Sequence, residues 1–160
     1  MTPRTIPVED FDIVVFGATG DLAQRKLLPA LFHRDIQGQI PEGARIIGSS
    51  RRPMTKQEFR AFAEAAIEVY VAKDERQKVL TKRFVERLDY VAAEPGKNDG
   101  WGELAKLLKP REDQVRVFYL AVGPDLFGPI SERLGKHGLV TEKSRVVVEK
   151  PLGKDLRSAR

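Results

Sequence analysis

The chain alternates between short apolar runs and longer stretches of mixed polarity. Five runs rich in β-branched residues predict strands, at residues 12–16, 45–48, 88–91, 114–120 and 145–148. Several of them are apolar at consecutive positions, which is typical of strands that helices cover on both faces. Helical patterns lie between them. The order therefore predicts an α/β fold with a doubly wound, mainly parallel sheet, helices on both faces and right-handed crossovers.

Local signals support the helix that follows the second strand. Thr55 and Glu58 match a capping box, in which each side chain accepts a hydrogen bond from the other residue's backbone N–H. Apolar residues then recur at intervals of three and four, which predicts a core-facing stripe rather than a ligand site: Phe59, Phe62, Ala63, Ala66, Ile67 and Tyr70. Residues 94–100 are rich in turn residues and predict a loop.

Length and composition narrow the classes of protein. The 160 residues suit one domain spanning 1–160. The absence of Cys excludes disulfides and thiolate sites and makes the cytoplasm the default compartment, and we expect no metal site. No apolar run approaches the roughly 20 residues that span a membrane. Lys and Arg exceed Asp and Glu by 28 to 23, but they are dispersed, which favours an anionic small molecule over nucleic acid.

The turn after the first strand is the strongest candidate for a ligand site. Residues 17–23 read Gly-Ala-Thr-Gly-Asp-Leu-Ala and lead into a helical pattern. Gly17 allows a tight turn, Gly20 lets a pyrophosphate approach the backbone, and Ala23 permits close packing of helix on strand. The helix N-terminus attracts an anion. Asp21 would repel a phosphate, so we expect it to cap the helix and face away. A turn without a ligand is the alternative.

The end of the second strand indicates which dinucleotide fits. An NAD site usually carries an acid there, for the ribose 2′-hydroxyl, whereas an NADP site carries a cation for the 2′-phosphate. Residues 48–52 read Gly-Ser-Ser-Arg-Arg, without an acid. We expect Arg51 to bind the 2′-phosphate bidentately, assisted by Ser50 or Arg52. NADP is favoured, NAD remains possible, and two solvating arginines at a strand end are the alternative.

Three motifs together carry a family resemblance. Residues 17–31, Gly-Ala-Thr-Gly-Asp-Leu-Ala-Gln-Arg-Lys-Leu-Leu-Pro-Ala-Leu, closely resemble the opening signature of glucose-6-phosphate dehydrogenases. Residues 118–121 look like the family's fourth strand, and residues 149–156 look like its Glu-Lys-Pro segment. The chain thus resembles the N-terminal NADP-binding domain of that family. It departs at Gly123, where the family commonly has the first of two prolines, so the contacts of residues 121 and 122 stay open.

The resemblance implies that glucose 6-phosphate is oxidised at C1 to 6-phospho-D-glucono-1,5-lactone, with hydride passing to NADP, as the first step of the pentose phosphate pathway. It implies that Lys150 and Lys26 bind the substrate, Lys150 between substrate and nicotinamide and Lys26 near the sugar phosphate. With the turn chemistry above, the expected cofactor contacts are Gly17, Ala18, Thr19, Gly20, Asp21, Leu22, Ser50, Arg51, Arg52, Ala121, Val122, Lys150 and Pro151.

The position of Lys150 agrees with that role. It follows a buried strand, so it is expected at the carboxyl edge of the sheet, where ligands bind in this architecture. An ammonium group there can orient a sugar hydroxyl toward the nicotinamide. Pro151 fixes the backbone, in a bond that tolerates the cis form. The alternative is that Glu149 and Lys150 are an ordinary charged pair leaving a strand.

The catalytic base is expected outside this chain. Hydride transfer from an alcohol needs a group that takes the hydroxyl proton, and the family's Asp-His pair and general-base histidine would follow Arg160. We assign no catalytic role to His33 or His137, so the chain alone should lack turnover. The family's dimer contacts belong to a C-terminal α+β domain that we consider absent here. The full-length protein is therefore expected to be a homo-oligomer, and apolar surface should be exposed on one side of the sheet.

Two other classes of protein compete with this interpretation. A non-enzymatic NADP-binding sensor explains the phosphate turn and Arg51, but neither Lys150-Pro151 nor the signature that continues through Pro29. A short-chain epimerase or reductase requires a Tyr-x-x-x-Lys pair. The tyrosines at 70, 90 and 119 are followed four residues later by Asp, Glu and Gly, which excludes that class as a self-contained catalyst.

Overall fold

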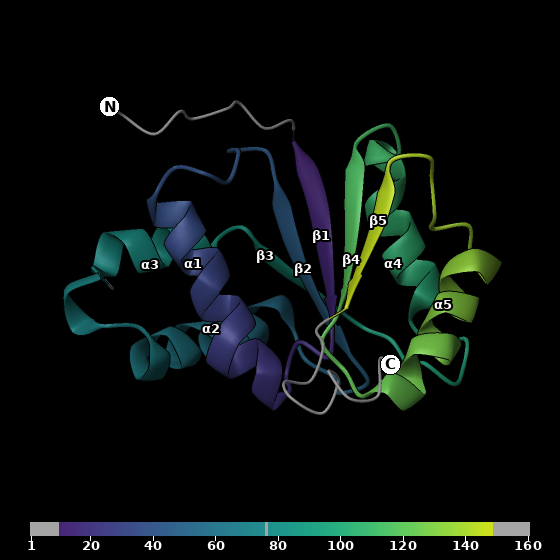
Figure 1. Cartoon of the computed structure of the whole chain (residues 1–160), viewed down its shortest axis with the longest axis horizontal. Helices are drawn as coiled ribbons and strands as arrows, with labels where there is room; N and C mark the ends of the chain where they lie inside the picture. The colour runs from purple at the N-terminus through teal and green to yellow at the C-terminus, as the bar shows by residue number, and fades with distance from the viewer. Residues whose placement is uncertain (1–9, 76, 149–160) are drawn as a thin grey trace, which may run out of the picture.

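The computed structural model describes residues 10–75 and 77–148. Within them five strands form one sheet in the order β3-β2-β1-β4-β5, and every pair of neighbours is parallel (Figure 1). The doubly wound parallel fold is confirmed, and each predicted strand is found within two residues of its expected ends. The strands are β1 (Phe11–Phe16), β2 (Arg45–Ser50), β3 (Leu88–Ala92), β4 (Val115–Leu120) and β5 (Ser144–Val148).

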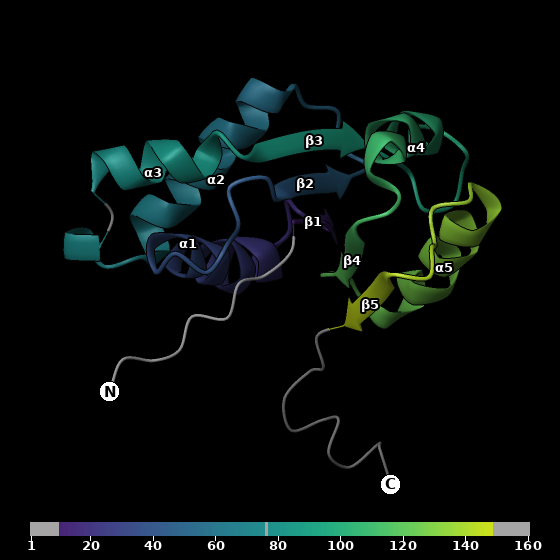
Figure 2. The same ribbon diagram turned by 90° about the horizontal axis from the view of Figure 1, so that it is seen from above.

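Helices cover both faces of this sheet, as Figures 1 and 2 show. One face carries α1 (Leu28–Ile36), α2 (Lys56–Tyr70) and α3 (Lys78–Val85), and the other carries α4 (Trp101–Leu108) and α5 (Phe127–Lys136). Alternate residues of β1 serve the two cores: Ile13 and Val15 pack toward α1 and α2, Val14 and Phe16 toward α4 and α5. This double burial explains the continuous apolar runs.

The predicted start of α2 is confirmed. Thr55 Oγ1 accepts a hydrogen bond from Glu58 N at 3.0 Å, and Glu58 Oε1 accepts one from Thr55 N at 2.7 Å. Four members of the predicted stripe are buried, Phe59, Ala63, Ala66 and Ile67, whereas Tyr70 is 41% exposed, so the stripe ends before it. A local sequence signal therefore sets where this helix begins, and its stripe sets which face is buried.

Buried charges hold the amino ends of the central strands. Asp12 of β1 is fully buried and accepts two hydrogen bonds from Arg45 of β2, at 2.8 and 2.7 Å, while Arg111 Nη1 lies 3.3 Å from Asp12 Oδ1. Arg116 of β4 is also buried and donates to the Leu108 carbonyl at 2.7 Å. Burial lowers the pKa of Arg116. These contacts lie at the edge of the sheet opposite the turn at Gly17.

Apolar side chains are exposed along β5, the strand at the end of the sheet. Val146, Val147 and Val148 are 53, 39 and 40% exposed. A cavity of about 640 Å³ adjoins Val147 and extends to Leu31 of α1. The exposed apolar surface expected from the sequence is therefore present on this flank. No helix in the described ranges is both long and apolar enough to cross a membrane.

Candidate functional site

The turn after β1 is built around a glycine that no other residue could replace without strain. Gly17 has a φ of 82°, which side chains rarely adopt. A Cβ at this position would overlap the carbonyl oxygen of Ala121 and lie 2.7 Å from Val122 Cγ1. The amides of Gly17 and Ala18 both donate to the Ser49 carbonyl, at 2.9 and 3.1 Å. The turn is thus packed between the ends of β2 and β4.

The helix that follows this turn contains a π-helical turn, Ala23–Leu27, close to its start, which the sequence reasoning missed. The Leu28 amide donates to the Ala23 carbonyl, five residues back. Pro29 supplies the physical reason, because it has no N–H and its ring would clash with the carbonyl four residues earlier in a regular α-helix. A wider turn relieves that clash, so Pro29 was the signal that could have revealed it.

Asp21 does not cap the helix, so that expectation was wrong. The cap position of the π-helical turn is Leu22, without a side-chain hydrogen bond, and the Asp21 carboxylate instead accepts from Arg25 Nε at 2.8 Å. Both side chains are exposed, and an i,i+4 ion pair on a helix surface competes with capping. Asp21 lies outside the wall of the cleft described next.

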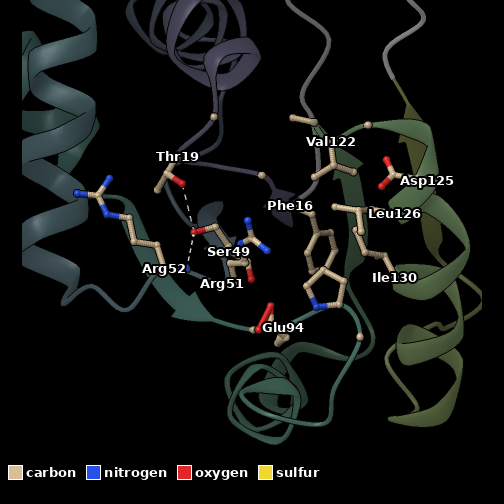
Figure 3. Close-up of a pocket in the computed structure, with 18 of the residues that line it drawn as sticks. Phe16, Thr19, Ser49, Arg51, Arg52, Glu94, Val122, Asp125, Leu126 and Ile130 are labelled. Atoms are coloured by element: carbon tan, nitrogen blue, oxygen red, sulfur yellow. Dashed lines mark hydrogen bonds between the residues drawn. The ribbon is translucent and has the colours of Figure 1, made fainter.

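A cleft of about 770 Å³ lies at the carboxyl ends of β1, β2 and β4, beside the loop after β3 and the start of α5 (Figure 3). Its volume is within the range of small-molecule sites. Eight of the predicted cofactor residues line it: Gly17, Thr19, Gly20, Ser50, Arg51, Arg52, Ala121 and Val122. The remaining lining includes an apolar group that the sequence reasoning did not single out: Phe16, Ala93, Pro95, Leu126 and Ile130.

The other predicted residues lie elsewhere. Ala18 is buried beneath the turn, and Leu22 packs against the core under α1 and α2. Lys26 is exposed on the π-helical turn and does not line the cleft. Lys150 and Pro151 lie outside the described residues.

A tyrosine from β3 organises the end of β2. The Tyr90 hydroxyl lies 2.6 Å from Ser50 Oγ and donates to the Arg52 carbonyl at 2.6 Å. Ser50 Oγ also accepts from Thr19 Oγ1 at 3.3 Å and from the Arg52 amide at 3.2 Å. Burial raises the pKa of Tyr90, so the phenol stays protonated and can donate. This bridge joins the Gly17 turn, through Thr19, to the backbone of Arg52. In the sequence, Tyr90 was noticed only as a member of a predicted strand.

The cleft combines a basic side with an apolar side, and its wall also carries two carboxylates, Glu94 in the loop after β3 and Asp125 just before α5. Arg51 and Arg52 are exposed, and neither forms an ion pair with any acid in the described part of the chain. In Figure 3, Arg52 points away from Phe16, Leu126 and Ile130, which gather on the opposite side. The arrangement can hold an elongated ligand with an anionic end and an apolar, flat end.

Neither histidine is part of this cleft. His33 is on α1, and His137 follows α5, where its ring stacks on Trp101 with centroids 6.2 Å apart. Across residues 10–75 and 77–148, no group of three or more His, Asp or Glu is placed to hold a metal ion. The described residues around the cleft can therefore bind and orient a ligand but include no histidine that could act as a base there.

Comparisons with known proteins agree with this geometry. The family model described as glucose-6-phosphate dehydrogenase, NAD binding domain, matches residues 14–160. Glucose-6-phosphate 1-dehydrogenase of Rhizobium meliloti (strain 1021) is 49% identical over 99% of this chain and 32% of its own length. The enzyme of Gluconobacter oxydans (strain 621H) is 46% identical over 95% of this chain and 32% of its own. The chain thus spans about a third of the length of these relatives.

Solved structures give the same result. A glucose-6-phosphate dehydrogenase in complex with its substrate glucose-6-phosphate superposes with a TM-score of 0.80 at 30% identity, covering 99% of this chain and 34% of that one. The glucose-6-phosphate 1-dehydrogenase from Mycobacterium avium also has a TM-score of 0.80, at 32% identity, over 95% of this chain and 32% of that one. The chain belongs to the glucose-6-phosphate dehydrogenase family and corresponds to its NAD-binding domain.

Proposed function

We propose that this chain is the NADP-binding domain of a glucose-6-phosphate 1-dehydrogenase. The full-length enzyme would oxidise D-glucose 6-phosphate to 6-phospho-D-glucono-1,5-lactone, with NADP as the acceptor of the hydride. The observation that carries the proposal is the meeting, in one cleft, of the Gly17 turn with Arg51 and Arg52. Family membership supports the reaction, and the geometry of the cleft supports the cofactor.

The turn and the start of the helix suit the pyrophosphate. Gly17, Thr19 and Gly20 line the cleft where the chain enters the helix. Backbone amides and the positive end of a helix dipole stabilise an anion at such a place. With Asp21 paired to Arg25, its carboxylate is directed to another partner and away from the phosphate position.

The end of β2 suits the 2′-phosphate. A guanidinium can donate two parallel hydrogen bonds to a phosphate, and Arg51 and Arg52 have no acidic partner among the described residues that would compete. The Tyr90 bridge fixes the side chain of Ser50 and the backbone of Arg52. An acid that would bind a ribose 2′-hydroxyl does not occur in residues 48–52, which supports NADP over NAD.

The apolar side of the cleft suits the adenine ring. Phe16, Leu126 and Ile130 face it from β1 and the start of α5, and Pro95 comes from the loop after β3. Ser49 also lines the cleft, and its hydroxyl is buried without a hydrogen-bond partner in the described structure. We call the space between Pro95 and Ile130 the base slot.

The residues of this chain would bind and orient, whereas the proton transfer belongs to the rest of the enzyme. Bound NADP supplies the carbon that accepts the hydride. We propose that Lys150 and Pro151 lie between substrate and nicotinamide, that Lys26 serves the sugar phosphate, and that full-length copies form a homo-oligomer. Without a histidine in the cleft among the described residues, the chain by itself is expected to bind NADP and to produce no NADPH.

Calorimetric titration of the chain with NADP and NAD tests the proposal. Arg51→Ala should lower the affinity for NADP by about tenfold to a hundredfold, because hydrogen bonds to a charged group contribute about 1.5–3 kcal/mol. Its affinity for NAD should not change. Arg145→Ala removes an exposed arginine from β5, far from the cleft lining, and serves as the matched control. An Arg51→Ala chain that still distinguished the two dinucleotides as the parent does would refute the assignment.

A further inference from the structure

We propose that Arg133 of α5 is a positioning residue that holds the loop after β3 in place as one wall of the base slot. The proposal rests on the proposed function, since it concerns how the same cleft is kept ready for its ligand. Arg133 does not line the cleft, so its effect would pass through the loop.

The contacts of Arg133 converge on that loop from a helix far along the chain. Its Nη2 donates to the Gly96 carbonyl at 3.1 Å, its Nε donates to the Pro95 carbonyl at 3.4 Å, and its Nη1 donates to Asn98 Oδ1. One planar guanidinium thus binds three acceptors within residues 95–98. A lysine ammonium is a point donor and could not reproduce this fork.

The base of the loop is fixed by other means. The Trp101 indole donates to the Glu94 carbonyl at 2.8 Å, and Gly100 adopts a φ of 84° at a position where a Cβ would overlap the Ala92 carbonyl oxygen. The tip is different, because residues 96–99 are exposed and burial contributes little to holding them. Arg133 is therefore the main tie between the tip of the loop and the rest of the molecule within the described contacts.

The same helix carries the opposite wall of the base slot. Ile130 is fully buried on α5 and lines the cleft, and Arg133 is three residues later, on the same face of the helix. The loop contributes residues 94–97 to the lining, among them Pro95 and Gly96, whose carbonyls Arg133 binds. Arg133 thus sets the distance between the two walls of the base slot. One wall is on its own helix, at Ile130, and the other is the loop that its guanidinium binds. A slot that is formed before binding does not lose free energy to loop ordering when the ligand enters.

The test compares Arg133→Met with the parent. Methionine keeps an unbranched apolar stem and removes every donor. We expect the dissociation constants of NADP and of 2′,5′-ADP to rise together by about tenfold, since both ligands place a base in the slot and would have to order the loop when they bind. Nicotinamide mononucleotide lacks that base, so its affinity should stay the same. Arg133→Lys should recover little, because it cannot bridge three acceptors.

Two further measurements separate positioning from a general loss of stability. Hydrogen exchange of residues 95–99 should rise in Arg133→Met, while exchange in β1 and β4 stays as in the parent. Trp101, the only tryptophan in the sequence, donates to the base of the same loop and reports its movement by fluorescence. Lys136→Met removes another cation from α5, at an exposed site, and should leave both readouts unchanged.

The outcomes are distinguishable. An Arg133→Met chain that binds 2′,5′-ADP as tightly as the parent would overturn the role of Arg133 and leave the proposed function intact. Equal losses for nicotinamide mononucleotide and 2′,5′-ADP would also overturn it, because they would indicate a general effect on the fold. A parent chain that binds neither NADP nor 2′,5′-ADP would overturn the proposed function and the proposal about Arg133 together.

Discussion

Replacing Gly17 by Ala should destabilise the chain by about 2–5 kcal/mol, and two separate effects contribute. The positive φ of 82° costs an L-residue about 1–2 kcal/mol. The new Cβ would also overlap the Ala121 carbonyl oxygen and lie 2.7 Å from Val122 Cγ1, which forces backbone atoms apart at a further cost of about 1–3 kcal/mol. A methyl group at one turn would therefore disturb the end of β4 as well.

Two other glycines separate these contributions. Gly38 has a φ of 73° and nothing within 4 Å of a new Cβ, so Gly38→Ala should lose only about 1–2 kcal/mol. Gly135 of α5 also has open space, with no positive φ, and Gly135→Ala should gain about 0.5–1 kcal/mol. Urea unfolding followed by the fluorescence of Trp101 measures all three. If Gly17→Ala unfolded no more easily than Gly38→Ala, the clash with residue 121 would not exist in solution.

Two more changes test the buried polar groups. Asp12→Asn should lower the free energy of unfolding by about 3–5 kcal/mol, because it leaves Arg45 and Arg111 without their anion. Asp113→Asn, at an exposed site, is the control. If the two variants unfolded at the same urea concentration, this prediction would be contradicted. Burial raises the pKa of Tyr90, so its contribution to stability is complete below the unfolded phenol pKa of about 10 and is lost as pH rises through the folded value. Above about pH 10 the free energy of unfolding of Tyr90→Phe should therefore change less with pH than that of the parent. If the two free energies changed with pH at the same rate, the raised pKa of Tyr90 would be refuted.

The parts of the fold that the sequence predicted correctly are those determined locally. The strands are apolar because both faces are covered, and the capping box at Thr55 requires only residues three positions apart. The turn at Gly17 follows from where glycines stand after a buried strand. Such features are legible because the residues that cause them are neighbours in the chain.

The parts that escaped prediction depend on distant partners or on competition between them. Tyr90 and Ser50 are 40 residues apart, and Arg133 is 35 to 38 residues from the groups that it binds. No periodicity marks such pairs, since only the packed sheet brings them together. Asp21 failed as a cap because Arg25, one turn later, offered its carboxylate a charged partner. The π-helical turn could have been predicted from Pro29, because a proline inside a helix lacks the N–H that a regular α-helical turn requires.

Because the buried charges lie at the amino edge of the sheet, the two ends of each central strand have different roles in this domain. The Asp12–Arg45 ion pair joins β1 and β2 near their amino ends, Arg116 of β4 donates there to the Leu108 carbonyl, and the same three strands end at the cleft. The contacts that secure the strands and the residues that line the cleft are thus separated by the full length of a strand. A change at residue 51 or 52 therefore removes none of the contacts of Asp12, Arg45 and Arg116 that secure the amino ends of the strands.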